Sequence, residues 1–325
     1  MSFKKNLTLI LALILATGFP MTMAKAADGE YVFITAGHDN PYWTTLGEGI
    51  KDGAKAKGVT AIVYEAKDNR DVEGELNLCL TALLRKPKIV VMGSLNASIA
   101  IQCFKKAAQE GIMVADIDAT LSVAEAEKEG IKLAFSIGSD NTLVGEEAAK
   151  YVAKVAAKPD PKIFVLEGLA GSGPGQKRVA GFKTKIQPLL PRSSIVASLA
   201  ADWDRLKAMT MTLDLLQRQP DIDIIYAAND TMALGAAEAV RNLHRDTQIK
   251  IIGVDGTEDA RKAVREGRLT ASVAQLPYLM GLRSVDLAIE ATAAHTTGRT
   301  VTTETPVLTK ELIEANKDPL LRYVR

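Results

Sequence analysis

Short apolar runs alternate with amphipathic segments along most of the chain. The first series of apolar runs predicts strands at 31–36, 60–65, 88–92, 113–117 and 132–137. Segments with helical periodicity lie between them, at about 42–57, 72–85, 97–110 and 123–128. Continuous apolar strands that alternate with helices indicate a parallel sheet covered by helices on both faces.

A second series of the same kind follows. Its apolar runs predict strands at 162–166, 194–199, 222–227, 249–254 and 269–274. Helical patterns lie near 175–187, 205–218, 231–242 and 257–266. Two successive series predict an α/β protein with two doubly wound, parallel-sheet lobes.

Composition and charge agree with a globular protein of this size. With 325 residues, 47% of them hydrophobic and 24% charged, the chain can form one large domain or two ordinary ones. Its formal net charge of +1 gives no electrostatic reason to expect nucleic acid or an anionic membrane surface as a partner. A small-molecule or protein partner is therefore expected.

The first 26 residues form a different kind of sequence. Lys4 and Lys5 precede an apolar run at 7–16, and Ala24-Lys-Ala26 supplies small residues at a cleavage position. This pattern is typical of a secretory signal peptide, and the run is too short for a membrane-spanning helix. No cysteine follows directly, so we expect no lipid anchor. The mature chain is expected to begin near Ala27, in the periplasm or outside the cell.

Both cysteines lie on predicted helices. Cys79 and Cys103 form either a disulfide, which an oxidising compartment permits, or two buried thiols on neighbouring helices. Their separation in space decides between these alternatives. No histidine stands at ligand spacing from them, so we expect no metal site.

Polar side chains follow three strands of the second series at the point where each strand ends. Asn229, Asp255 and Gln275 come directly after predicted strands. In an open parallel sheet, ligands bind outside the carboxyl ends of the strands, so these side chains are expected to face one crevice. The alternative is that they are only turn-forming and strand-ending residues. Two amides and a carboxylate suit the recognition of a polyhydroxyl compound.

These residues also belong to longer segments that carry a family resemblance. The segments are 40–43 (Asn-Pro-Tyr-Trp), 139–141, 167–171, 201–205, 226–235, 253–256 and 274–277. With them the chain resembles the periplasmic solute-binding proteins of sugar ABC transporters, in the branch of the ribose- and allose-binding proteins (type I periplasmic binding proteins). The resemblance covers nearly all of the chain after the leader and is densest at 201–277.

The resemblance implies a fold and a set of domain limits. Two lobes are joined by a multi-strand hinge and close around the ligand, in the venus-flytrap arrangement. The chain is expected to cross between the lobes near Ser139, after Gln275 and near Pro306. The expected limits are 1–26 for the signal peptide, 27–138 with 276–307 for the N-terminal lobe, and 139–275 with 308–325 for the C-terminal lobe.

The resemblance also implies the ligand-binding residues. Aromatic rings cover the apolar faces of a sugar, and polar side chains bond its hydroxyl groups. Trp43 and Trp203, the chain's two tryptophans, both fall at matching positions, although Trp43 is also a candidate core residue. The full expected set is Asn40, Tyr42, Trp43, Asp118, Arg178, Trp203, Asn229, Asp255 and Gln275.

The chain departs from the ribose and allose branch in the first lobe. Ala119 stands where the ribose branch has Arg, Ala36 where Ser or Lys is found, and Gly93 where the ribose branch has Asn. Shortened side chains leave volume, which predicts a bulkier sugar, a deoxy sugar or an open-chain polyol with bridging water. His38 and Asp39 are candidates for replacement contacts.

The expected function is that of a monomeric periplasmic carrier. It binds a small carbohydrate or polyol and delivers it to an ABC permease driven by its ATPase, with no cofactor and no catalysis. A sensor that presents bound sugar to a chemoreceptor or sensor kinase is an alternative. A periplasmic carbohydrate-active enzyme is a weaker alternative, which stays open because Asp118 and Asp255 imitate the pair of carboxylates in a glycosidase.

Two other classes find less support in the sequence. The glycine-rich segment 168–175 resembles a phosphate-binding loop, but it lacks the G-x-G-x-x-G spacing and the Gly-Lys-Ser/Thr sequence. A sugar-responsive transcription factor shares the fold of the two lobes. It needs a DNA-binding headpiece before the first lobe, where this chain has the leader.

Overall fold

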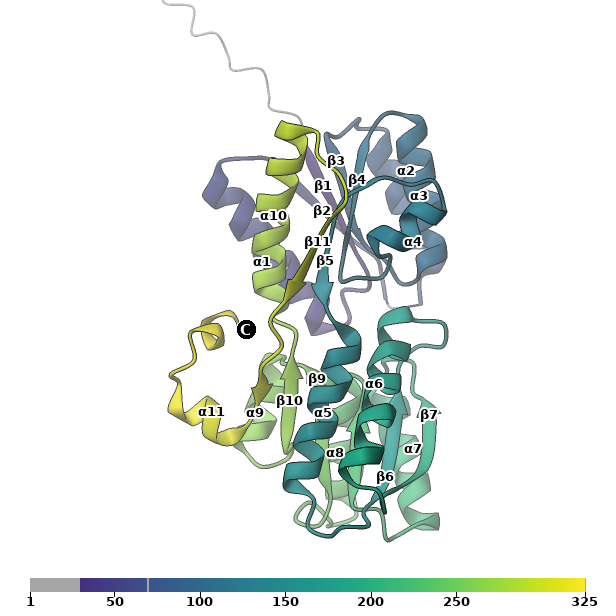
Figure 1. Cartoon of the computed structure of the whole chain (residues 1–325), viewed down its shortest axis with the longest axis vertical. Coiled ribbons are helices and arrows are strands. Elements are labelled where there is room, and N and C mark those ends of the chain that lie inside the picture. Colours follow the sequence, from purple (N-terminus) through teal and green to yellow (C-terminus); the bar gives the residue numbers. More distant parts are fainter. Residues whose placement is uncertain (1–29, 69, 325) are drawn as a thin grey trace, which may run out of the picture.

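Two lobes are stacked along the long axis of the molecule, and each contains one six-stranded sheet with helices on both faces (Figure 1). The computed structural model describes residues 30–68 and 70–324, and the expected leader lies outside them. The predicted α/β fold of two doubly wound, parallel-sheet lobes is confirmed.

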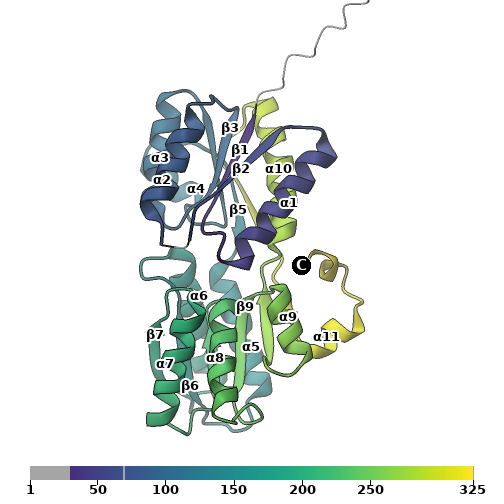
Figure 2. The same ribbon diagram turned by 180° about the vertical axis from the view of Figure 1, so that it is seen from behind.

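The first lobe has the strand order β11-β5-β4-β3-β1-β2, and all of its neighbouring strands are parallel. Helices α1 and α10 pack together on one face, and α2, α3 and α4 lie on the other (Figures 1 and 2). The strands are β1 (Tyr31–Thr35), β2 (Ala61–Glu65), β3 (Ile89–Gly93), β4 (Met113–Ile117), β5 (Leu133–Ser139) and β11 (Arg299–Thr303). The helices are α1 (Pro41–Lys57), α2 (Val72–Leu83), α3 (Ala97–Gln109), α4 (Val123–Lys128) and α10 (Pro277–Ala294).

The second lobe has the strand order β12-β10-β9-β8-β6-β7, and only β12 is antiparallel among its described strands. Helices α5 and α6 pack together, and α7 and α8 pack together on the opposite face (Figure 2). The strands are β6 (Lys162–Glu167), β7 (Ser194–Ala200), β8 (Ile224–Ala227), β9 (Lys250–Asp255), β10 (Ala271–Ala274) and β12 (Val307–Leu308). The helices are α5 (Asn141–Val155), α6 (Gly173–Leu189), α7 (Arg205–Arg218), α8 (Asp230–Asn242), α9 (Glu258–Arg265), α11 (Lys310–Ala315) and the 3-10 helix η1 (Pro319–Tyr323).

Three segments connect the lobes. The chain crosses between β5 and α5, between β10 and α10, and between β11 and β12. The Ser139 and Thr303 hydroxyl oxygens, at the ends of β5 and β11, lie 3.1 Å apart and share a hydrogen bond. Two of the three connecting segments therefore run side by side, at the place where the hinge between the lobes is expected.

Each lobe has a hydrophobic core of its own. The core of the first lobe includes buried residues of α10, such as Met280 and Val285, and that of the second includes Leu308 and Leu321 from the C-terminal tail. Apolar strands such as β1 and β3 are buried along their whole length. Burial on both faces explains why the strands read as continuous apolar runs.

The structure contains elements that the pattern did not predict. Helix α5 fills the interval between the two predicted series; Asp140 caps its N-terminus by accepting hydrogen bonds from the Thr142 and Leu143 amides. Strand β11 lies mostly exposed at the edge of the first sheet, where it pairs with β5. Strand β12 and helix α11 were missed as well.

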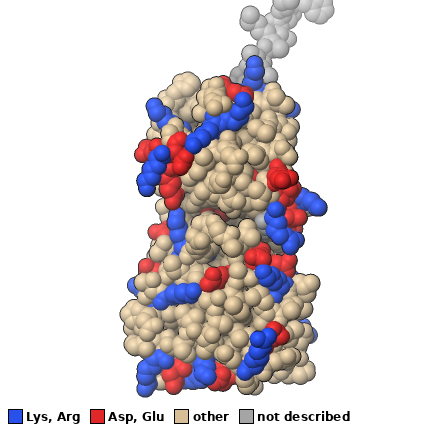
Figure 3. Space-filling model, turned by 90° about the vertical axis from the view of Figure 1, so that its right-hand side faces the viewer, with Lys and Arg blue, Asp and Glu red and all other residues tan. Residues whose placement is uncertain are grey.

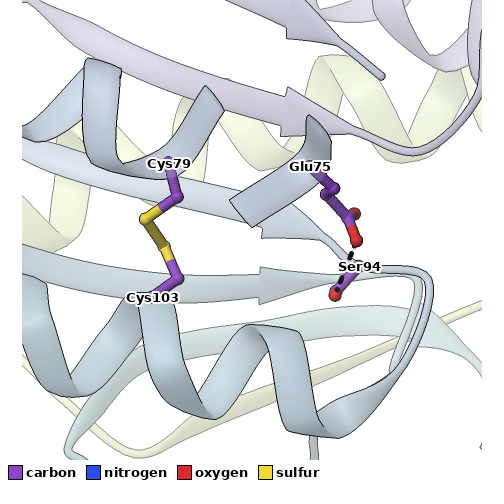
Figure 4. Close-up of a disulfide and its surroundings, with 4 residues drawn as sticks. All are labelled: Glu75, Cys79, Ser94 and Cys103. Carbon is purple, nitrogen blue, oxygen red and sulfur yellow. Dashed lines mark hydrogen bonds between the residues drawn. A yellow bond between two sulfur atoms is a disulfide. The ribbon is translucent and has the colours of Figure 1, made fainter. Parts of the chain in front are cut away.

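The two cysteines form a disulfide. Cys79 on α2 and Cys103 on α3 have Cα atoms 5.9 Å apart, within the range that a disulfide requires. Both side chains are fully buried, and the bond joins two neighbouring helices on one face of the first sheet (Figure 4). The disulfide alternative of the sequence analysis is therefore confirmed over the pair of free thiols.

The visible surface carries charges of both signs without a large patch of either. On the face drawn in Figure 3, lysine and arginine side chains alternate with acidic ones, and a hollow separates the two lobes at mid-height. Among the described residues, no helix combines the length and the apolar character needed to cross a membrane.

Candidate ligand-binding cleft

A cleft lies between the two lobes at the carboxyl ends of their parallel strands. Its unoccupied space, open mouth included, is about 480 Å³. The first lobe contributes Asn40, Tyr42, Trp43, Ser94, Leu95, Asp118 and Thr120, and the second contributes Ser172, Pro174, Arg178, Trp203, Asn229, Asp255 and Gln275. All nine residues of the predicted set line this one cleft; their roles in binding stay a prediction.

Arg178 is the centre of a hydrogen-bond network in the second lobe. Its Nε donates to Asn141 Oδ1 at 2.7 Å, and its Nη1 donates to Ala228 O at 2.8 Å and lies 3.4 Å from Asp255 Oδ1. Gln275 Nε2 also donates to Asp255 Oδ1, at 2.7 Å. None of these bonds uses Arg178 Nη2. The guanidinium is thus fixed by the protein and keeps one nitrogen for another acceptor.

Close packing of α5 against α6 places Arg178 beside Asn141. A Cβ atom at Gly145 would lie 2.0 Å from Arg178 O, so only glycine permits this approach of the two helices. The Arg178 guanidinium carbon also lies 5.8 Å from the centre of the Trp203 ring, a cation–π distance. Sequence reasoning found Arg178 but not Asn141, which is buried behind the cleft.

Trp203 forms an apolar wall of the second lobe, and the glycine-rich segment makes room for it. A Cβ atom at Gly168 would lie 2.0 Å from the ring atom Cη2 of Trp203, and one at Gly175 would lie 3.0 Å away. Trp203 itself has a φ of 62°, in the left-handed region. Packing against a tryptophan therefore explains glycines that, in the sequence, resembled a phosphate-binding loop.

Two asparagines cap the helices that begin at the cleft. Asn40 Oδ1 accepts from the Tyr42 amide at the start of α1, and Asn229 Oδ1 accepts from the Met232 amide at the start of α8. Asn229 Nδ2 has no hydrogen-bond partner among the described residues, and neither has Gln275 Oε1. Buried polar atoms normally have partners, so an unpaired donor and an unpaired acceptor in a cleft indicate places for a ligand.

The first lobe supplies aromatic rings and a carboxylate. Tyr42 donates its hydroxyl proton to Asp118 Oδ1 at 2.5 Å, and the Tyr42 and Trp43 rings pack edge to face with centroids 5.1 Å apart. Trp43 belongs to the core of the lobe and also lines the cleft, and its stacking on a sugar ring stays a prediction. Tyr42 is 3% exposed and contributes by orienting Asp118.

Burial sets the electrostatics of the cleft. Desolvation raises the pKa of Asp118, while Arg178 on the opposite wall and the Tyr42 hydroxyl act to lower it. Desolvation also raises the pKa of Asp255 to about 7, against the stabilising effects of Arg178 and Gln275. Behind Asp255, burial raises the pKa of Asp230 to about 8, and the nearby Asp255 charge adds to this. Burial therefore opposes ionisation of all three carboxyl groups.

The backbone is strained at the cleft-lining carboxylates. Asp118 and Asp255 have φ values of 77° and 119°, which residues other than glycine rarely adopt. Asp230 supports the Asp255 loop by accepting hydrogen bonds from the Thr257 amide at 2.9 Å and the Ser272 hydroxyl at 2.7 Å. Strain that the surrounding structure maintains is typical of functional sites.

The structure corrects the expectation that shortened side chains leave volume in the first lobe. The Trp43 ring fills the space above Gly93, since a Cβ atom there would lie 2.7 Å from Trp43 Cζ3. Ala36 and Ala119 do not line the cleft, and neither do His38 and Asp39, which are exposed outside it. The expected free volume at Gly93 was wrong because the Trp43 ring occupies it. The bulkier sugar, deoxy sugar or open-chain polyol inferred from these positions stays a prediction.

The polar groups that the first lobe adds are the hydroxyls of Ser94 and Thr120. Ser94 follows β3 and Thr120 follows β4, so a search for polar residues after every strand would have found both. Leu95, Ser172 and Pro174 also line the cleft and were not predicted. Among the described residues, no group of three or more His, Cys, Asp or Glu side chains is placed to hold a metal ion.

Comparison with known proteins identifies the family. The sequence profile of the "Periplasmic binding protein domain" matches residues 31–296. The chain is 30% identical over 274 residues to the D-allose-binding periplasmic protein of Escherichia coli K12, covering 84% of this chain and 88% of the relative. It is 31% identical over 289 residues to the ribose import binding protein of the same organism, covering 89% and 92%.

A solved structure has the same architecture. The ABC transporter periplasmic solute binding protein of Actinobacillus succinogenes 130z, with bound D-allose, superposes with a TM-score of 0.82 at 26% identity. The match covers 88% of this chain and 99% of the other. These relatives are binding proteins and not enzymes. The chain belongs to the periplasmic binding protein family.

Proposed function

We propose that this protein is the solute-binding component of an ABC importer and that it binds a neutral monosaccharide or sugar alcohol between its lobes. The observation that carries the proposal is the composition of the cleft. Trp43 and Trp203 offer rings for the apolar faces of a sugar, and amides, carboxylates and a guanidinium surround them. Relatives named for allose and ribose support the same class of ligand.

The charges of the cleft favour a neutral ligand. Its ionisable lining residues are two carboxyls, Asp118 and Asp255, and one guanidinium, Arg178. The guanidinium is already bonded to Asn141, Ala228 and Asp255, so only its Nη2 remains for a ligand and part of its charge is balanced by Asp255. Sugar acids and sugar phosphates would bring a negative charge into a site that already holds two buried carboxyl groups, which is costly.

The proposed cycle follows from the hinge. The ligand binds to one lobe, the lobes close, and the closed form docks on a membrane permease with its ATPase. The cleft is complete within one chain, so we propose that a monomer acts in the periplasm, after removal of a leader. Presentation of the closed form to a chemoreceptor or sensor kinase would use the same site and stays a prediction.

A thermal-shift screen tests the proposal. The mature protein is stripped of ligand by unfolding and refolding, then screened against pentoses, hexoses, deoxysugars and sugar alcohols, with sugar acids as the charged set. A ligand at about 100 times its Kd stabilises the folded state by roughly 2.7 kcal/mol, which raises the Tm measurably. We expect a shift with one or a few neutral compounds. No shift across the neutral panel would refute the proposal.

Two substitutions test the residues. Asp255→Ala and Trp203→Ala should each weaken binding of the identified ligand by about 2–4 kcal/mol, since one removes a charge-assisted hydrogen bond and the other a desolvated ring. Isothermal titration calorimetry measures the change, and Asp246→Ala, at an exposed aspartate of the same lobe, is the matched control. Unchanged affinity in both variants would show that the ligand binds elsewhere.

A further inference from the structure

Glu75 is a buried carboxylate that does not line the cleft but holds residues that do. It lies on α2 and is 0% exposed. The Leu95 amide donates to both of its carboxylate oxygens, at 3.1 Å each, and the Ser94 hydroxyl lies 3.2 Å from its Oε2 (Figure 4). Ser94, Leu95 and Thr120 line the cleft in the first lobe, and we call these three residues its floor. Glu75 thus reaches the cleft through the loop between β3 and α3.

The chemistry of this position is unusual for a helix that faces a hydrophobic core. The other buried residues of α2 are Cys79, Ala82 and Leu83, and an apolar side chain at position 75 would fill the core at less desolvation cost. Burial is costly enough to raise the pKa of Glu75 to about 7. The hydrogen bonds to the loop are the interactions that a carboxylate makes here and an apolar residue cannot.

The disulfide fixes the helix that carries this carboxylate. Cys79 lies one turn after Glu75 on α2, and Cys103 lies on α3, the helix that the β3–α3 loop enters through the cap residue Asn96 (Figure 4). The loop is therefore bounded by a helix that is covalently joined to the helix of Glu75. This arrangement restricts movement of the carboxylate relative to Ser94 and Leu95.

The two hydroxyl groups of the cleft floor, those of Ser94 and Thr120, donate their protons to other atoms of the protein. Ser94 has one proton, and its acceptors are Glu75 Oε2 and Asn96 O at 2.9 Å, both protein atoms. Thr120 Oγ1 donates to Ser94 O at 3.0 Å. A hydroxyl that has donated its proton offers only lone pairs to a further partner. Ser94 and Thr120 therefore face a ligand as acceptors, beside the carboxylate of Asp118.

We propose that Glu75 is a positioning residue for ligand recognition and that it fixes the first-lobe floor as a surface of hydrogen-bond acceptors. This inference rests on the proposed function. A ligand that fits must present hydroxyl groups that donate to Ser94 and Thr120. Ether, carbonyl or fluorine substituents at those places have no proton to give, so the floor rejects them.

Fluorinated ligands test the acceptor surface in the wild-type protein. Once the neutral sugar is identified, calorimetry compares the parent with its deoxy and deoxyfluoro analogues at each hydroxyl position. Fluorine keeps an acceptor and removes the donor. We expect at least one position where the fluoro analogue binds no better than the deoxy analogue and about tenfold or more below the parent. Ser94→Ala should abolish the loss at one such position. Recovery of affinity with fluorine at every position would overturn the inference.

The role of Glu75 is tested with Glu75→Gln. A glutamine has one acceptor oxygen and cannot accept from both the Leu95 amide and the Ser94 hydroxyl as the carboxylate does, so Ser94 keeps Asn96 O as its acceptor and loses its tie to α2. We expect the Kd of the parent sugar to rise about tenfold and the discrimination against the fluoro analogue to weaken at the position assigned to Ser94. Glu73→Gln, an exposed change of the same charge on the same helix, should match the wild type.

Several results would count against the inference or the function, and one, a variant that fails to fold, would leave the decision to the other measurements. If Glu75→Gln weakens all analogues by the same factor, Glu75 only supports the fold. If it binds like Glu73→Gln, Glu75 has no part in recognition. If the variant does not fold, the analogue series on the wild type and on Ser94→Ala still decides the acceptor surface. A wild-type protein that binds no neutral sugar would overturn the proposed function, and this inference with it.

Discussion

The two walls of the cleft use different chemistry. The second lobe holds its side chains in a connected network, in which Arg178, Asp255 and Gln275 bond one another and Trp203 lies against glycine backbone. The first lobe uses aromatic rings, a carboxylate and two hydroxyls; Tyr42 donates to the carboxylate of Asp118, and the buried residue Glu75 accepts from the hydroxyl of Ser94. The second wall is therefore held by bonds among residues that line the cleft. In the first wall, Ser94 is held by a residue that lies outside the cleft.

The largest expected effect comes from breaking the charge network of the second lobe. Arg178→Met leaves Asp255 buried without its cation, which should cost about 3–5 kcal/mol in the stability of the ligand-free protein, with loss of ligand binding. Urea denaturation and calorimetry measure the two effects. Lys177→Met, an exposed cation on the neighbouring position of α6, is the control. A stability equal to that of the control would mean that the network is not maintained in solution.

Removing the disulfide should weaken the first lobe alone. The bond joins residues separated by 24 positions, and closing a loop of that length stabilises a folded protein by about 3 kcal/mol through the entropy of the unfolded chain. We expect Cys79→Ala with Cys103→Ala to lower the unfolding free energy by about this amount. Hydrogen exchange should show the loss in α2 and α3, while amides of the second lobe keep their protection. Equal loss in both lobes would contradict the independence of the two cores.

A smaller effect is expected from the hydroxyl that orients Asp118. Tyr42→Phe leaves the Asp118 carboxylate without its donor and should weaken ligand binding by about 1–3 kcal/mol. Calorimetry against the identified ligand measures this loss. The matched control is Tyr31→Phe, whose hydroxyl bonds Thr292 at 3.3 Å outside the cleft. If both variants bind equally well, Asp118 does not need to be oriented.

The smallest expected effect, counted per group and per pH unit, is a slope of folding stability with pH. Burial raises the pKa values of Asp255 and Glu75 to about 7 and of Asp230 to about 8, whereas the unfolded values are about 4. The folded protein therefore keeps protons that the unfolded chain releases. The stability that these protons contribute is complete below about pH 4 and is lost as the pH rises through 7 to 8.

Each group contributes at most about 1.4 kcal/mol per pH unit to that slope. Urea denaturation of the ligand-free protein at pH 6 and pH 8 should give the higher stability at pH 6. Asp230→Asn tests the contribution of the second lobe and Glu75→Gln that of the first, with Asp246→Asn as a control. A stability that rises with pH in this interval would contradict the assigned direction.

Most of the fold was predictable from the sequence because a strand that is buried on both faces is a continuous apolar run, which is easy to recognise. A strand such as β8 is apolar at every position, so its run at 222–227 was visible. Strand β11 was missed because Arg299-Thr-Val-Thr-Thr303 is short and mostly exposed, and it becomes a strand only by pairing with β5. Helix α5 was missed although Asp140 supplies a cap that the sequence displays.

The site was predictable where a residue type is tied to a strand end. Asn229, Asp255 and Gln275 carry that pattern, and all three line the cleft. Ser94 and Thr120 do not stand out, because neutral hydroxyl residues are common in turns and gain importance only when two loops meet. The space above Gly93 could not be judged either, because the Trp43 ring that fills it comes from another segment of the chain.

The placement of the two tryptophans has a practical consequence. The chain contains two, and both line the cleft, one on each lobe. The ultraviolet emission of tryptophan depends on the polarity of its surroundings, and here that emission comes only from the walls where a ligand would displace water. All tryptophan emission of the protein therefore originates at the walls of the cleft, and a change in that emission would report directly on what enters it.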